Sequence, residues 1–386
     1  MRMKKILPTV ILGAALAAPL AQADDAGSTI PTTTIGGLIF TDLTSISTTQ
    51  SQAGKPDIDR DPNGLGLDVK RGYLIVNHTI DDVWSTGIVT DFNFASYKAT
   101  STSTSTVTGG TPGESVATTT TTTVATPETQ LFIKNLYLQG HFDDWATLRI
   151  GAASMPWTSY VEGVYGYRFV ENTLTDRSAF ANTADWGVHA LGGDSLVSYA
   201  VSLVNGGGYK NPSRSKGMDE EGRIAVTPLD GRLIIAAGLY SGKRGLDTEA
   251  TPAVNTASRE DLFLAWKASG LTVGLEWFDA DKWNNVLTPA GMPTTKSSGT
   301  SLFGSYDFPD TAFSVFARYD DVKPTQDTDA SQEDKYYNAG VAWRYSPQIT
   351  WALAYKDDKV TDNLKLNNST DSLKTGEFGI WAQVKF

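Results

Sequence analysis

The last ten residues of the chain, 377–386, are EFGIWAQVKF. Every second side chain is apolar, and these side chains fall on one face: Phe378, Ile380, Ala382, Val384 and Phe386. Because successive side chains of a strand point to opposite faces, this alternation predicts a β-strand with one apolar surface. Segments of about ten residues with the same alternation, separated by turns, recur along the chain and are typical of a transmembrane β-barrel.

Sixteen segments of this kind can be counted, and an even number suits a closed antiparallel barrel. Tight turns, such as Asp81-Asp82 and Ser346-Pro347, alternate with long loops. This pattern predicts an all-β outer-membrane barrel with both termini in the periplasm. We expect strands near residues 34–45, 67–80, 83–97, 129–142, 145–152, 184–193, 195–205, 220–228, 231–241, 259–269, 271–281, 299–308, 310–321, 334–345, 347–358 and 374–386.

Aromatic residues gather at both ends of the expected strands. Membrane interfaces favour such residues, so two aromatic girdles are expected on the outer surface. Beside the turns they include Trp84, Phe142, Trp145, Phe308 and Phe386, and nearer the loops Tyr97, Tyr240, Trp277, Tyr319, Tyr336 and Tyr355.

The N-terminal residues 1–23 have the three parts of a secretory signal peptide. A basic segment with Arg2, Lys4 and Lys5 precedes an apolar run, and the small-x-small sequence Ala21-Gln22-Ala23 follows it. An N-terminal membrane anchor is the alternative, but the apolar run is short and contains two prolines. The longest later apolar run, 233–239, has about seven residues, too few for a membrane helix. We therefore expect residues 24–386 to form the exported barrel.

The composition narrows the possible functions. The formal net charge is −11, and removing residues 1–23 with their three basic residues would make it −14. A nucleic-acid partner is therefore not expected. The chain has no cysteine, three histidines (His78, His141 and His189), and neither a Gly-x-Ser-x-Gly nor a His-Glu-x-x-His motif. We expect no enzymatic activity, no metal and no cofactor, with a Ser/His/Asp site scattered in sequence as the alternative.

Between two expected strands, residues 152–183 show no sustained helical or strand period. An insert of this length inside a compact fold is usually functional. It contains aromatic residues such as Trp157, Phe169 and Phe180 beside several charged ones, so it should pack against the rest of the protein. We expect this segment to fold into the barrel and narrow its pore.

The pattern of the mature chain resembles that of the sixteen-stranded porins of Gram-negative bacteria, whose third long loop bends into the barrel. The resemblance implies that 152–183 forms the constriction, that Phe386 is the signal for the barrel-assembly machinery, and that the protein is a homotrimer. The constriction would be lined by aromatic and charged loop residues: Tyr160, Glu162, Tyr165, Tyr167, Arg168, Glu171, Asp176 and Arg177.

A narrower resemblance covers about thirty residues. Arg149-Ile150-Gly151 followed by Pro156 and Trp157 is similar to the phosphate-selective porin family. That family lines its constriction with many arginines and lysines, whereas the loop here has only two arginines and also carries three acidic residues.

Charged residues on the polar faces of the expected strands should line the lumen, because an Arg or Lys facing lipid at mid-depth costs about 2 to 4 kcal/mol. The basic ones are Arg149, Arg223, Arg232, Lys267, Arg318, Arg344, Lys356 and Lys385, and the acidic ones are Asp91, Asp185, Glu276, Asp320 and Glu377. Eight minus five gives a basic excess of three, which predicts a weak preference for anions. The alternative is that these residues pair with one another and only keep the lumen wet.

These features predict an outer-membrane channel for passive diffusion of ions and small hydrophilic solutes, surrounded by lipid and lipopolysaccharide. Two alternatives stay open. One is a substrate-specific channel for phosphate or, given Tyr160, Tyr165 and Tyr167, for sugar. The other is a surface structural protein whose barrel is only an anchor. The Thr-rich segment 98–127 predicts an exposed external loop, with a glycosylated or partner-bracing segment as its alternative.

Overall fold

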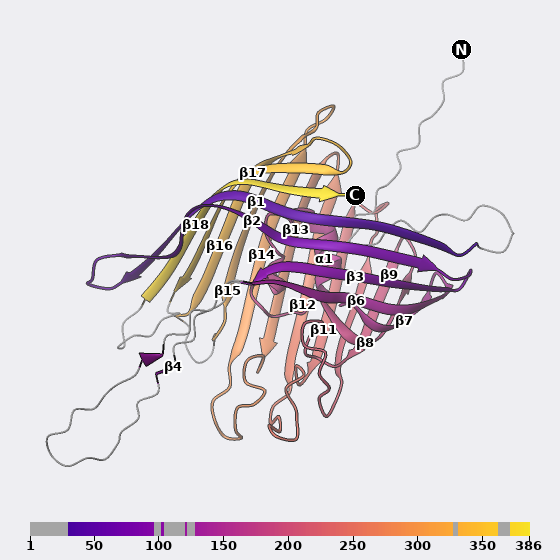
Figure 1. Cartoon of the computed structure of the whole chain (residues 1–386), viewed down its shortest axis with the longest axis horizontal. Coiled ribbons are helices and arrows are strands. Elements are labelled where there is room, and N and C mark those ends of the chain that lie inside the picture. The colour runs from indigo at the N-terminus through magenta and orange to yellow at the C-terminus, as the bar shows by residue number, and fades with distance from the viewer. Residues whose placement is uncertain (1–29, 96–101, 104–119, 122–127, 327–330, 362–370) are drawn as a thin grey trace.

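Sixteen antiparallel strands close into one barrel in the computed structural model, which describes residues 30–95, 102–103, 120–121, 128–326, 331–361 and 371–386 (Figure 1). The signal peptide expected at 1–23 lies outside these residues. The Thr-rich segment is described only at β4 (Thr102–Ser103) and β5 (Thr120–Thr121), which pair with each other. Among the described residues, no helix has the length and apolar character needed to cross a membrane.

Each of the sixteen segments predicted from the alternation corresponds to a strand of the barrel, so the fold prediction is confirmed. The strands are β1 (Thr32–Gln52), β2 (Ile58–Thr79), β3 (Trp84–Ala95), β6 (Glu128–Asp143), β7 (Ala146–Ser154), β8 (Ala184–Gly193), β9 (Val197–Val204), β10 (Asp219–Val226), β11 (Leu233–Gly242), β12 (Ala257–Ala268), β13 (Leu271–Asp281), β14 (Lys296–Asp307), β15 (Phe313–Lys323), β16 (Glu333–Arg344), β17 (Ile349–Thr361) and β18 (Asp371–Lys385).

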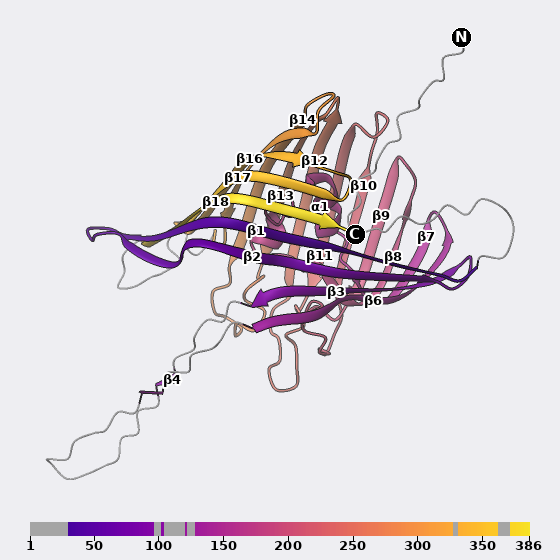
Figure 2. The ribbon, with the colours of Figure 1, turned by 45° about the horizontal axis from the view of Figure 1, so that its top comes forward.

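The first long loop was predicted wrongly. Residues 46–66 are mostly strand, because β1 and β2 continue to within a few residues of each other and form one long hairpin. In both views its tip reaches past the neighbouring strand ends (Figures 1 and 2). This part of the hairpin is mostly polar and carries only isolated apolar side chains, namely Ile46, Ile58 and Leu65, so it lacks the apolar alternation that reveals the other strands. Its inward side chains hold it to the sheet, since the Gln50 amide donates to Asp371 Oδ2 at 3.2 Å.

Side chains alternate between an apolar outer surface and a mixed interior. In β12, Leu262 and Leu264 are exposed on the outside, whereas Asp261 and Phe263 are buried. The same alternation runs along β13 and β15. An apolar outer face and a polar inner face are what a barrel in a bilayer requires.

Outward-facing aromatic residues pair with one another at the end of the barrel that carries the short turns. The pairs are Trp84 with Phe142, Trp145 with Tyr199, and Phe313 with Trp343. The girdle expected at the other end is partly wrong, because Tyr240 and Tyr336 are buried inside the barrel. Their hydroxyls are held there, since Tyr240 donates to Asp219 and Tyr336 accepts from Asn338.

The barrel closes where β18 pairs with β1, and Phe386 completes this seam. Its backbone N–H donates to Gly37 O at 3.1 Å, and its carbonyl accepts from Gly37 N at 2.9 Å. The phenyl ring covers Gly37 so closely that a Cβ there would lie 2.2 Å from the ring's Cζ. The absence of a side chain at residue 37 therefore makes room for the terminal ring.

We predict that Gly37→Leu and Phe386→Ala will each lower the yield of inserted, heat-modifiable barrel, because both remove the contact between ring and backbone at the seam. The double variant should lose less than the sum of the two, since the second change removes a contact already lost. Gly222→Ala in β10 is the control, because a Cβ there meets nothing within 4 Å. Fully additive losses would show that the ring does not act through Gly37.

Candidate pore and its third loop

The segment between β7 and β8 spans 155–183, because β7 continues to Ser154 rather than ending at the expected residue 152. It also contains regular structure that was not predicted, α1 (Thr158–Tyr165) and α2 (Leu174–Arg177). Gly166 ends α1 in a left-handed conformation with φ 79°. Helices of eight and four residues are too short for a helical period to be recognised in the sequence. In both views α1 lies within the outline of the barrel (Figures 1 and 2).

Apolar side chains of this loop are packed against the inner faces of the strands. Trp157, Val161, Val170 and Leu174 have no exposed surface. Trp157 contacts a cluster that includes Phe263 and residues of β10, β11 and β14, while Val170 belongs to a second cluster formed with β1, β2 and β15–β18. Burying side chains of this size contributes about 1.5 to 3 kcal/mol each. The loop is thus part of the protein core.

The start of the loop is fixed by two buried carboxylates. The Trp157 indole N–H donates to Glu276 Oε1 at 3.0 Å, and its backbone N–H donates to Glu221 Oε1 at 2.9 Å. Glu221 also accepts from Arg259, which bonds to Asp261 and to the carbonyl of Phe180 at the far end of the loop. Both ends of the loop are therefore attached to the same wall of β10, β12 and β13.

A second set of contacts holds α2. The Arg177 guanidinium lies 3.0 Å from Asp320 and Asp334 and 3.5 Å from Asp358. Arg318 pairs with Asp320 and donates to the backbone carbonyl of Asn172. These contacts join the loop to β15, β16 and β17.

A third set lies near the seam. Lys356 Nζ is 3.2 Å from Glu171 and 2.5 Å from Glu377, and Lys70 Nζ donates to the Val170 carbonyl at 2.8 Å. Burial opposes ionisation of the Glu171 carboxyl, but Lys356, Lys70 and Arg177 outweigh it and hold its pKa below the ordinary value of 4.5. Ionised Glu171 therefore stabilises the loop at neutral pH, and this contribution declines as the pH falls below 4.5.

The eight residues expected in the constriction all lie on this loop, but several are used for packing. Tyr165 is buried, and Tyr167 stacks on Phe316 with ring centroids 4.2 Å apart. Arg168 pairs with Glu162 and lies 4.0 Å from Asp176, and Tyr160 lies under the Arg223 guanidinium. These contacts leave few loop charges without a partner.

The residues expected on the pore wall separate into three groups. Arg318 and Lys356 are buried and paired with acids, as the alternative interpretation expected. Arg149 donates to Gln139, and Arg223 donates to Ser198 and to the carbonyl of Pro156. Among the described residues, no ion pair involves the third group, Lys267, Arg344 and Lys385. One assignment is wrong, because Arg232 lies in a turn before β11 and pairs with Asp230 outside the wall.

Several inward charges escaped the sequence analysis, and they reverse the predicted charge excess. The described inward wall carries twelve basic residues, namely Arg60, Lys70, Arg71, Lys134, Arg149, Arg223, Arg259, Lys267, Arg318, Arg344, Lys356 and Lys385. It carries fourteen acidic residues, namely Asp42, Asp68, Asp91, Asp185, Asp219, Glu221, Asp261, Glu276, Asp307, Asp320, Asp334, Asp358, Asp371 and Glu377. Twelve minus fourteen gives −2, so the predicted basic excess of three is wrong.

Charge is instead distributed unevenly along the barrel. Five of the basic residues lie toward the short turns: Arg149, Arg223, Lys267, Arg344 and Lys385. Only Asp307 opposes them at that level among the described wall residues. The other acids lie deeper or near the loops, where most of them accept hydrogen bonds from Arg177, Arg259 or Lys356, or from Tyr240. One of these pairs could have been found in the sequence. Arg259 and Asp261 lie two residues apart, so they fall on the same face of a strand and can pair there.

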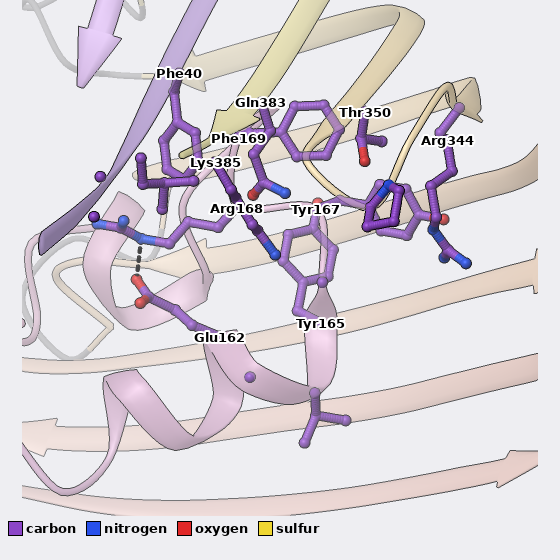
Figure 3. Close-up of a pocket in the computed structure, with 18 of the residues that line it drawn as sticks. Phe40, Glu162, Tyr165, Tyr167, Arg168, Phe169, Arg344, Thr350, Gln383 and Lys385 are labelled. Atoms are coloured by element: carbon purple, nitrogen blue, oxygen red, sulfur yellow. Dashed lines mark ion pairs between the residues drawn. The ribbon is translucent and has the colours of Figure 1, made fainter. Parts of the chain in front are cut away.

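A cavity of about 780 Å³ opens between the loop and the short-turn ends of the strands. Figure 3 shows Tyr165, Tyr167 and Arg168 of the loop facing Gln383, Thr350 and Lys385 across it. Lys267 and Arg344 also line it, with Thr272, Ser305 and Ser314 between them. The cavity thus combines unpaired cations, hydroxyl groups and aromatic side chains.

A closed barrel of sixteen antiparallel strands with this arrangement defines the fold of an outer-membrane porin. The sequence matches no protein-family model and no curated protein. Solved structures similar in fold include the outer-membrane channel DcaP of Acinetobacter baumannii, with a TM-score of 0.60, 13% identity, and coverage of 92% of this chain and 97% of that one.

Two further similar structures are porins. The anion-selective porin from Comamonas acidovorans has a TM-score of 0.58 and 11% identity, and the match covers 92% of this chain and 100% of that chain. OmpF of Salmonella typhi, solved with daunomycin, has a TM-score of 0.51 and 11% identity, with coverage of 92% and 97%. At these identities the likeness concerns the fold.

We predict that Arg177→Met will lower the free energy of unfolding by about 3 kcal/mol, because it leaves Asp334 and Asp358 without their cation and Asp320 with Arg318 alone. The value is at the low end for buried pairs, since Asp358 is 39% exposed. Lys216→Met is the control, because its ion pair with Glu249 is largely exposed and should change stability by less than about 1 kcal/mol. Urea unfolding in detergent measures both, and equal effects would contradict a role of Arg177 in holding the loop.

Proposed function

We propose that the protein is a passive diffusion channel of the bacterial outer membrane, exported through its signal peptide, through which ions and small hydrophilic solutes pass. The observation that carries this proposal is the closed barrel whose interior is lined by charged and hydroxyl groups and crossed by the anchored loop 155–183. A polar interior behind an apolar outer face has a use only if water and solutes occupy it.

The loop narrows the passage in this proposal. Its contacts follow the wall continuously from β10 through β18 to β1 and β2, which is more than half of the barrel's circumference, and this supports a position across the lumen rather than outside it. Because the ion pairs of Arg177, Arg168 and Glu171 fix its backbone, the constriction is rigid on the timescale of ion passage. The loop residues that face the cavity, Tyr167 among them, then set the size of the opening.

The channel prefers anions weakly, although the wall has no basic excess. Charges that are paired within a few ångströms largely cancel at the distance of a passing ion, whereas unpaired charges act over about 8 Å at physiological salt. Among the described residues that line the cavity, Lys267, Arg344 and Lys385 are charges of this kind, and they outnumber the one such acid, Asp307. The anion selectivity stated for the Comamonas porin, which shares the fold, is compatible with this proposal.

The alternatives have less support. A sugar-specific channel would need free aromatic faces, but Tyr167 stacks on Phe316 and Tyr165 packs against Phe303. An enzymatic role would need an accessible base, but His189 is buried, and its Nδ1 is already 2.8 Å from Ser202 Oγ. A barrel that serves only as an anchor does not require unpaired cations in an open cavity. The homotrimer, and contacts with lipid, lipopolysaccharide and the barrel-assembly machinery, belong to the same proposal.

We predict that excising residues 159–177 and joining the ends with a short Gly/Ser linker will raise single-channel conductance, because it removes the segment that narrows the passage. The barrel should still close, because the loop contributes no strand to it. Heat-modifiable migration checks that the variant is folded. Tyr167→Ala provides a milder change and should give a smaller increase. Unchanged conductance in both folded variants would place the constriction elsewhere.

We predict that a reversal potential across a potassium chloride gradient will show weak preference for chloride. The triple variant Lys267→Gln/Arg344→Gln/Lys385→Gln should reduce or abolish it, because it removes the unpaired cations at the short-turn end. Lys335→Gln is the control, since this lysine pairs with Glu333 near the loops. Preference for potassium in the unmodified protein would contradict the anion preference but leave the channel function intact.

A further inference from the structure

Four polar side chains of the cavity form a continuous row across the last three strands. Arg344 of β16 is paired in register with Thr350 of β17, which is paired with Gln383 of β18. Lys385 lies two residues beyond Gln383 and therefore on the same face. All four line the cavity, and Figure 3 shows them together at its margin.

The row carries two cations and shares the cavity with one acidic wall residue, Asp307. No ion pair among the described residues involves Arg344, Lys385 or Asp307, so two positive charges face one negative charge. Glu162 also lines the cavity, but Arg168 neutralises it. A cationic pair flanked by a hydroxyl and an amide can bind a carboxylate through charge-assisted hydrogen bonds.

The spacing decides which kind of anion fits. Arg344 and Lys385 lie two strands apart, roughly 10 Å between backbones, which their long side chains can bridge around one carboxylate. Lys267 on β12 is six strands from Lys385, roughly 29 Å along the wall, so it cannot contact the same group. A compact inorganic oxyanion could contact the same two cations, but it would leave most of the cavity's 780 Å³ to water.

Apolar side chains also border the cavity beside this row. Val164 and Tyr167 of the loop and Ile75 of β2 are only partly buried, and all three line the cavity. Although the Tyr167 face is covered by Phe316, its edge and the Val164 side chain remain available for an apolar group. A solute with a carboxylate at one end and a small hydrocarbon body at the other satisfies both sides.

We propose that Arg344, Thr350, Gln383 and Lys385 form a binding site for small organic carboxylates whose apolar body rests against Val164 and Tyr167. In the channel proposed above, this site would be the last contact of such a solute before the short-turn end. The proposal rests on that channel function for its role, but the binding itself can be measured without conduction.

The test uses 4-fluorobenzoate as the probe and the folded full-length protein in a non-ionic detergent. The fluorine resonance should broaden beyond its width in protein-free micelles, and the double variant Arg344→Gln/Lys385→Gln should weaken binding roughly fivefold or more. Lys335→Gln, at the other end of the barrel, should bind as the unmodified protein does. Neutral fluorobenzene should show little broadening beyond the micelle control.

Competition separates the two parts of the site. Unlabelled benzoate should displace the probe at lower concentration than acetate, because acetate lacks the apolar body, and inorganic phosphate should compete no better than acetate. Equal binding by the double variant, or equal broadening of fluorobenzene, would overturn the proposed site. Phosphate competing better than benzoate would overturn the assignment to organic carboxylates. A protein that binds the probe but carries no current would refute the channel function and leave the site standing.

Discussion

The structure depends on the requirement that no backbone N–H or C=O group remain unpaired in hydrocarbon. An open sheet in a bilayer would leave two edges at a cost of several kcal/mol for each group, so the sheet must close. Closure fixes the even strand number and the pairing of β18 with β1, which runs along the whole of β18. It also fixes the direction of every side chain, because inward and outward positions alternate. The apolar exterior and polar interior follow from this alternation.

A closed barrel of this size encloses more space than its own side chains fill, and the third loop occupies part of it. The loop buries large apolar groups such as Trp157 and Val170, but its ends and its helices are positioned by charges. Buried ion pairs are costly to desolvate and add little net stability, while the loss of one partner is strongly unfavourable. We therefore assign the ion pairs of Arg177 and Glu171 to specificity: they select one position of the loop, and the apolar contacts provide most of its stability.

The sequence predicts the fold well and the interior poorly, for a physical reason. The outer face is in contact with one uniform solvent, so its alternation is regular, and segments such as 271–281 were located to the residue. The interior contacts water, a loop and other charges, so its composition follows no simple pattern. Residues 47–52 of β1 were missed because both faces of the strand are polar there. Lys134 was missed because it lies at a register shift between β3 and β6, where the alternation slips by one residue.

The same reason explains why counting charges gave the wrong sign for the wall. A sequence count treats every charge as equal, but Arg318 next to Asp320 presents almost no net field to a solute, whereas Lys385 presents nearly all of its own. Coulomb energy scales as about 332/(εr) kcal/mol, so one unpaired charge near a solute exceeds several neutralised pairs that lie further away. What a barrel of this type attracts is therefore decided by which charges the third loop leaves without partners. The loop's Arg177 pairs with acids on β15–β17, and its carboxylates Glu162 and Glu171 pair with Arg168 and Lys356. No loop carboxylate is therefore left to pair with the cations at the short-turn ends, and the charge that the wall presents there depends on how the loop packs.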